Sequence, residues 1–299
     1  MLPAHKQLEQ GIAHQTAGRL NEALACLRLA GEAEDAELRV EALRLQAIVH
    51  HMRSEWDAAL ATAARAADEA RAHELPDQAA EALNVQAAVH QARGDFDGAI
   101  ALFDEILASR TSHRVRGLAL QNLGSIAAQR GDFETARRHF LASHQLFRRA
   151  GYLHGEAVVL NNFGRAAVDT GNFRVAADML PQALSAARRL GDAELVALTT
   201  MNYAEALAGQ RELDRASALA GEALAHFTAA GNSWRRVECL RLLGDIRRDR
   251  GEPAAAAALY DDALTVATEI GALAEVELLR KRRAAAGGAG GAGGASQGA

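Results

Sequence analysis

The 299-residue sequence contains few proline and aromatic residues: four prolines and 4% aromatic side chains. Alanine, the best helix former, is abundant instead. A sheet protein of this length would need far more valine, isoleucine, threonine and tyrosine. The composition therefore predicts an all-α protein and excludes a β-sandwich or β-barrel.

Long apolar runs are also missing. No stretch approaches the ~18 consecutive apolar residues of a membrane-spanning helix. The first ten residues have no basic cluster followed by an apolar stretch, as a signal peptide would. We therefore expect a cytoplasmic protein without a membrane partner. The net charge of −5 argues against nucleic acid as a partner, because such proteins are usually basic overall or along one face.

The sequence has little that points to catalysis or cofactors. Cys26 and Cys239 are the only cysteines and form neither a disulfide framework nor a metal-ligand pair. P-loop, zinc-protease and serine-hydrolase motifs are absent, so we expect no enzyme activity, no cofactor and no metal. Lys6 and Lys281 are the only lysines. The preference for arginine, with so much alanine, is typical of high-GC bacterial genomes.

A turn of the form Gly-x-apolar-x-x-Ala recurs along the chain. Clear copies begin at Gly18, Gly94, Gly131, Gly171 and Gly251, and degenerate copies begin at Ser54 and Arg211. The spacings are 36, 40, 37, 40, 40 and 40 residues. A fixed period of this length indicates stacked supersecondary units.

Each repeat contains two segments of helical periodicity on either side of the turn, for example 118–127 and 136–147. The turn glycine permits positive φ and ends the first helix. Small residues recur in the middle of the first helix, where they predict close contact between helices: Gly11, Ala47, Ala87, Gly124, Gly164, Ala204 and Gly244.

This pattern resembles the tetratricopeptide repeat (TPR) family. The fourth repeat matches the family pattern at Leu120, Asn122, Leu123, Gly124, Gly131, Phe133, Ala136 and Phe140. The resemblance covers roughly residues 4 to 270. It implies a right-handed superhelical solenoid of about seven antiparallel helix pairs. The period of about 40 residues is similar to that of the long-repeat type.

Three segments follow from this reading. Residues 1–271 are expected to form the seven-repeat solenoid, and residues 272–283 a C-terminal capping helix. Leu273, Val276 and Leu279 should face the last repeat. Residues 284–299 are a Gly/Ala run that we expect to be a flexible tail.

Histidines replace the family's usual tyrosine in three successive repeats, at His14, His50 and His90. Equivalent helices in a stack lie at least ~8 Å apart, so a shared metal ion is not expected. We expect these rings to fill space between helices, with a pH-sensitive packing row as the alternative.

Asparagines recur at the fifth or sixth position of the first helix, although asparagine is a poor helix former. In TPR proteins the first helices line the concave surface, so the resemblance implies a row of amides along a groove. An amide can pair with both the N–H and the C=O of an extended peptide. We predict a peptide-binding site comprising Asn84, Gln121, Asn122, Asn161, Asn162, Arg165, Asp169, Asn202 and Glu205. The alternative is that the asparagines tie neighbouring helices together.

The sequence therefore favours a scaffold or adaptor that binds a protein or peptide segment in the concave groove. The alternative function is a peptide-responsive regulatory protein whose superhelix changes on ligand binding. RNA binding is disfavoured by the acidic balance and by the few aromatic residues for base stacking.

Overall fold

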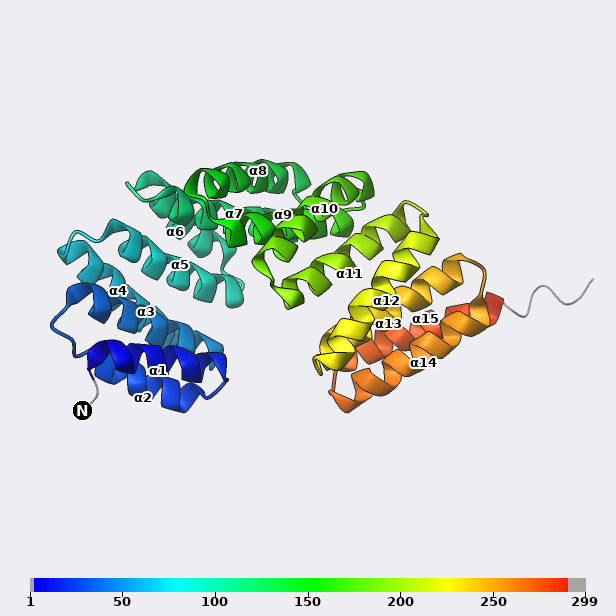
Figure 1. The fold of residues 1–299 in the computed structure, drawn as a ribbon, viewed down its shortest axis with the longest axis horizontal. Coiled ribbons are helices and arrows are strands. Elements are labelled where there is room, and N and C mark those ends of the chain that lie inside the picture. The colour runs from blue at the N-terminus through cyan, green and yellow to red at the C-terminus, as the bar shows by residue number, and fades with distance from the viewer. Residues whose placement is uncertain (1–2, 290–299) are drawn as a thin grey trace, which may run out of the picture. The chain divides into compact units, whose positions relative to one another are not determined.

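The computed structural model describes residues 3–289, which form fifteen helices and no strand (Figure 1). The chain divides into two compact units, Met1–Gly155 and Glu156–Ala299. The first unit contains α1 (Ala4–Thr16), α2 (Leu20–Ala30), α3 (Ala36–Met52), α4 (Trp56–Ala72), α5 (Pro76–Ala92), α6 (Phe96–Ala108), α7 (His113–Gln129) and α8 (Phe133–Ala150).

The second unit begins within α9 (Leu153–Asp169) and continues through six further helices. These are α10 (Phe173–Leu190), α11 (Ala193–Gly209), α12 (Leu213–Ala229), α13 (Ser233–Asp249), α14 (Pro253–Glu269) and α15 (Leu273–Ala289). Seven helix pairs followed by one final helix confirm the predicted all-α architecture. We call the odd-numbered helices of the seven pairs first helices and the even-numbered ones second helices.

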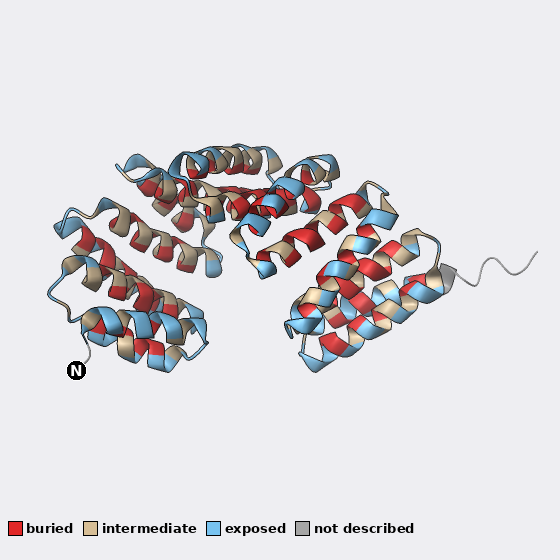
Figure 2. Ribbon diagram, viewed as in Figure 1, coloured by how far each residue is buried: buried red, intermediate tan, exposed pale blue. Residues whose placement is uncertain are grey.

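Each unit is a stack in which a helix packs against its sequence neighbours. First helices of successive repeats also contact one another, as α3 does α5 and α5 does α7. Figure 2 shows buried residues on the faces where helices meet. Fully buried side chains such as Phe103 in the first unit, and Phe227 and Tyr260 in the second, lie in these interfaces.

The recurring turn has the geometry that its glycine predicts. Gly131 has φ 79°, and the N–H of Asp132 donates to the carbonyl of Ala127 across the turn at 2.9 Å. The Asp132 side chain then accepts from the Thr135 N–H at 3.0 Å and caps the second helix. The degenerate copies make the same turn without glycine, with φ 60° at Ser54 and 68° at Arg211.

Glycines in the first helices allow the second helix to approach closely, as predicted. A Cβ atom at Gly124 would lie 2.8 Å from the Phe140 ring, and one at Gly244 would lie 2.5 Å from the Tyr260 ring. These distances are too short for a side chain, so each aromatic ring packs directly on the helix backbone.

The C-terminal helix differs from the prediction in two respects. Val276 and Leu279 are buried as expected, but Leu273 is 81% exposed because it is the first residue of α15 and precedes the packed face. The helix also continues to Ala289, so a flexible tail from residue 284 is wrong for residues 284–289. Alanine favours helix, and Ala286 packs into the cluster that contains Tyr260. Residues 290–299 of the predicted tail lie outside the described residues.

Candidate functional site

The predicted asparagines form two hydrogen-bonded bridges between first helices. Asn122 Nδ2 on α7 donates to Asn84 Oδ1 on α5 at 2.9 Å. Asn202 Nδ2 on α11 donates to Asn161 Oδ1 on α9 at 2.9 Å. In both bridges the acceptor asparagine lies ten residues before the first residue of the turn in its own repeat. The donor asparagine, in the following repeat, lies nine residues before the first residue of the turn in that repeat. The repeat therefore generates the same cross-helix contact in each unit.

Burial separates the two bridges. Asn161 and Asn202 are only 4% and 2% exposed, so the expectation that all the asparagines lie open in a groove is wrong for this pair. The neighbouring helices enclose them, and their contact is the helix tie considered as the alternative. Asn84 and Asn122 are half-buried, and their bridge leaves the Asn84 amide N–H groups and the Asn122 carbonyl available to a ligand.

The remaining two amides of the predicted site make no such bridge among the described residues. Asn162 on α9 is half-buried, and its side-chain amide makes no hydrogen bond with another residue of the described chain. Gln121 on α7 is also half-buried, and its Oε1 atom lies buried without a hydrogen-bond partner within residues 3–289. Their role in peptide binding stays a prediction.

The predicted charged residues form one cluster in the second unit. Arg165 on α9 donates to Asp169 on the same helix at 3.0 Å and to Glu205 on α11 at 2.5 Å. Although burial disfavours its charge, the hydrogen bonds to both carboxylates raise the pKa of Arg165. Two carboxylates facing one guanidinium leave a net negative charge, so this cluster suits a cationic group rather than a carboxylate of a ligand.

A cavity of about 270 Å³ lies between the first helices α3, α5 and α7 of the first unit. Its apolar lining consists of Ile48, Val85, Ala88 and Leu118, and its polar lining consists of Arg44, His51, Glu81, Asn84 and Arg114. An apolar surface with a few convergent polar groups is typical of a ligand site. The cavity includes one predicted residue, Asn84, whereas the other lining residues were not predicted.

Ion pairs hold the polar side of this cavity. Glu81 pairs with Arg114 on α7, and its other oxygen lies 3.5 Å from Arg44 Nε on α3. Arg44 also pairs with Glu41 at 2.6 Å. The Arg114 side chain remains 41% exposed, whereas Glu81 is 17% exposed. A carboxylate of a ligand can therefore meet Arg114 while the Asn84 amide meets a peptide group.

Arg44 shares its position in the repeat with a predicted asparagine. Arg44 lies ten residues before Ser54, and Asn84 lies ten residues before Gly94. Both side chains therefore occupy the same face of their first helices. The shared position, rather than the residue type, is the signal in the sequence that links Arg44 to Asn84.

Each of the three histidines makes a local contact across the turn of its own repeat. His50 Nδ1 lies 2.5 Å from Glu55, and His90 Nδ1 lies 2.7 Å from Asp95, across the turn of the same repeat. Arg19 Nε similarly donates to His14 at 2.9 Å. Each ring therefore joins the end of a first helix to the residue that precedes the second helix.

Other site types receive no support within residues 3–289. These residues contain no group of three or more His, Cys, Asp or Glu side chains that could hold a metal ion. None of their helices has the length and apolarity needed to cross a membrane. Cys239 is buried, and burial raises the pKa of its thiol to about 12, so this cysteine is a poor nucleophile.

Comparison with known families finds a match to part of the chain. The tetratricopeptide repeat model matches residues 116–189. No curated protein matches the chain significantly. Among solved structures, a tetratricopeptide repeat protein from Parabacteroides merdae is similar at 14% identity and TM-score 0.55, over 95% of this chain and 98% of that one.

Two further solved structures are similar to the chain. A Rap protein complexed with competence and sporulation factor is 14% identical with TM-score 0.57, over 95% of this chain and 74% of that one. Aspartyl phosphate phosphatase F from Bacillus subtilis is 11% identical with TM-score 0.62, over 94% of this chain and 78% of that one. At these identities the likeness shows the fold alone, and the fold occurs both in a complex with a named factor and in an enzyme.

Proposed function

We propose that the chain, of which residues 116–189 match the tetratricopeptide repeat model, is a protein-interaction scaffold that binds an extended peptide segment on the first helices of its first unit. The observation that carries this proposal is the cavity of about 270 Å³ between α3, α5 and α7. An apolar side chain of the segment enters between Val85, Ala88 and Leu118.

Polar groups around the cavity fix the rest of the segment. The Asn84 amide N–H groups left over from its bridge donate to a backbone carbonyl of the segment. Arg114, held by Glu81 yet partly exposed, meets an acidic side chain or a chain-terminal carboxylate. The segment therefore carries an apolar residue close to a negative charge.

The predicted residues of the second unit form a separate candidate surface. Asn162 can pair with a peptide backbone, and the Arg165 cluster, which has an excess of negative charge, favours a basic side chain. Asn161 and Asn202 support this surface by joining α9 to α11. We assign no catalytic step to the chain.

A second candidate is a regulatory protein that changes conformation when it binds a peptide. The similarity to a Rap protein complexed with competence and sporulation factor supports this candidate at the level of the fold. It predicts that a bound segment slows hydrogen exchange in helices that do not contact it. Protection confined to α3, α5 and α7 would favour the simple scaffold.

Photo-crosslinking from the cavity tests the scaffold. A photoreactive phenylalanine analogue at position 88 will capture the partner segment in a native lysate, and mass spectrometry will identify the attached peptide. The control places the analogue at Ala101, which is exposed on the second helix of the same repeat. Equal capture at both positions, or capture at Ala101 only, would contradict binding on the first helices.

A further inference from the structure

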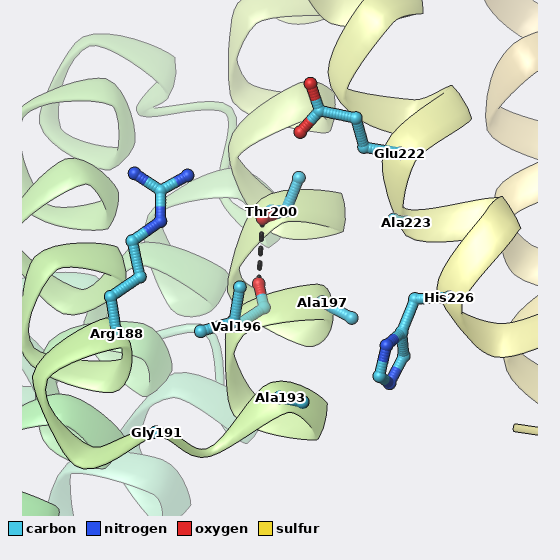
Figure 3. Close-up of a pocket in the computed structure, with 9 residues that line it drawn as sticks. All are labelled: Arg188, Gly191, Ala193, Val196, Ala197, Thr200, Glu222, Ala223 and His226. Atoms are coloured by element: carbon cyan, nitrogen blue, oxygen red, sulfur yellow. Dashed lines mark hydrogen bonds between the residues drawn. The ribbon is translucent and has the colours of Figure 1, made fainter.

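A larger cavity, of about 380 Å³, lies in the second unit (Figure 3). Second helices form its two sides, α10 at the Arg188 end and α12 at the His226 end, and the N-terminal half of α11 forms its floor. It is lined by Arg188, Gly191, Ala193, Val196, Ala197, Thr200, Glu222, Ala223 and His226. None of these residues belongs to the predicted peptide site, and no residue lines both cavities.

The cavity coincides with a departure from the repeat at Thr200. Leucine lies eleven residues before the first residue of the turn in the second to fifth repeats and in the seventh: Leu43, Leu83, Leu120, Leu160 and Leu240. In the neighbouring repeats this leucine is buried, with Leu160 5% and Leu240 7% exposed. The sixth repeat has the shorter Thr200 instead, so the space of a leucine side chain stays unfilled.

The floor of the cavity is apolar despite this threonine. The Thr200 hydroxyl donates to the Val196 carbonyl at 2.8 Å within α11, as the dashed line in Figure 3 marks. The hydroxyl proton is therefore already donated within α11. Ala197 and Ala223, both buried, complete a surface that suits an aliphatic side chain.

The rim carries opposite charges on opposite sides. Figure 3 shows Arg188 on one side of α11 and Glu222 with His226 on the other. Arg188 and Glu222 make no ion pair or side-chain hydrogen bond with another residue of the described chain, although arginines such as Arg165 and Arg211 in the same unit do. Both charges are therefore available to a ligand.

We propose that this cavity is a second binding site, for an extended segment of a partner protein in which an aliphatic residue lies between an acidic and a basic one. The aliphatic side chain occupies the space beside Thr200. The acidic side chain pairs with the Arg188 guanidinium, which can bind a carboxylate through two N–H groups. The basic side chain pairs with Glu222, so the two charges orient the segment across α11.

A synthetic peptide provides the direct test. Acetyl-Gly-Asp-Leu-Lys-Gly-amide is titrated into the full chain, and binding is followed by NMR of the methyl groups of Thr200, Ala197 and Ala223. We expect saturable shifts at these methyl groups. Peptides with alanine in place of leucine, or with asparagine and glutamine in place of the charged residues, should bind at least fivefold more weakly.

Two variants separate binding from folding. Thr200→Leu restores the residue of the other repeats, so it should fill the cavity, keep or raise the melting temperature and weaken peptide binding at least tenfold. Thr228→Leu, the matched control, makes the same change at an exposed position of α12 outside the cavity and should bind like the wild type. Arg188→Gln and Glu222→Gln should each weaken binding about threefold or more.

The opposite results would overturn the site. No shift at millimolar peptide, unchanged binding by Thr200→Leu, or equal binding of the uncharged peptide would each exclude a charge-flanked aliphatic segment as the occupant. These outcomes are independent of binding at the cavity of the first unit.

Discussion

Replacing Asn202 by alanine tests whether the buried amide bridge holds α9 and α11 together. The variant removes the Nδ2 donor that lies 2.9 Å from Asn161 Oδ1. Because Asn161 is only 4% exposed, its carbonyl would be left without a donor and with little access to water. An unsatisfied buried polar group costs about 1–3 kcal/mol.

The better helix propensity of alanine offsets part of this loss, by up to about 0.7 kcal/mol. We therefore expect Asn202→Ala to lower the free energy of unfolding by about 1–2 kcal/mol. The equivalent bridge in the first unit is half-buried, so water can replace the lost partner. Asn122→Ala should consequently lower the free energy of unfolding by about 0.5 kcal/mol or less.

A double-mutant cycle measures the contact itself. Urea unfolding followed by circular dichroism is compared for Asn161→Ala, Asn202→Ala and the double variant, with hydrogen exchange reporting on α9 and α11. The double variant should lose less than the sum of the single losses, by about 1 kcal/mol, because it leaves no orphaned carbonyl. Additive losses, or no loss at Asn202→Ala, would refute the role of this pair as a helix tie.

Three further predictions concern other parts of the chain. A thiol reagent at about pH 8 should label half-buried Cys26 and spare Cys239 until urea is added, because burial raises the pKa of the Cys239 thiol to about 12. Ser54→Gly should raise the free energy of unfolding by about 0.5–1 kcal/mol, measured by urea titration, because Ser54 has φ 60°; no gain would contradict strain at this turn. The hydrogen bond that the Gly98 N–H donates to the Asp95 carboxylate holds the pKa of Asp95 below its ordinary value. The stability from Asp95 is thus present above about pH 4 and lost as the pH falls through the lowered pKa, and Asp95→Asn should flatten the dependence of unfolding free energy on pH in that range.

The turns and helix pairs were predictable because their signals are local and repeated. Positive φ at Gly131, the cap that follows it and the close packing at Gly124 each depend on neighbours within one repeat. Even Ser54 and Arg211 could be assigned to turns, because their spacing from the clear copies compensates for the missing glycine. The extent of α15 was missed because a Gly/Ala composition does not reveal that Ala286 is buried.

The site was predicted only in part, because contacts between repeats depend on how far one helix is offset from the next. The sequence indicates that Asn161 and Asn202 occur on first helices. It does not indicate that the residue ten positions before one turn contacts the residue nine positions before the next turn. This contact between repeats buries Asn161 and Asn202. The space beside Thr200 could have been found by comparing repeats, but only once the equivalent Leu160 and Leu240 were known to be buried.

Titration of the captured partner segment tests the central claim most directly. Calorimetry compares the wild type with Ala88→Arg, which fills the cavity between α3, α5 and α7, and with Ala101→Arg, which adds the same side chain on exposed α6. We expect Ala88→Arg to weaken binding at least tenfold, about 1.4 kcal/mol, and Ala101→Arg to bind like the wild type, with unchanged far-ultraviolet circular dichroism for both. Wild-type affinity in Ala88→Arg would show that the segment does not bind at this cavity.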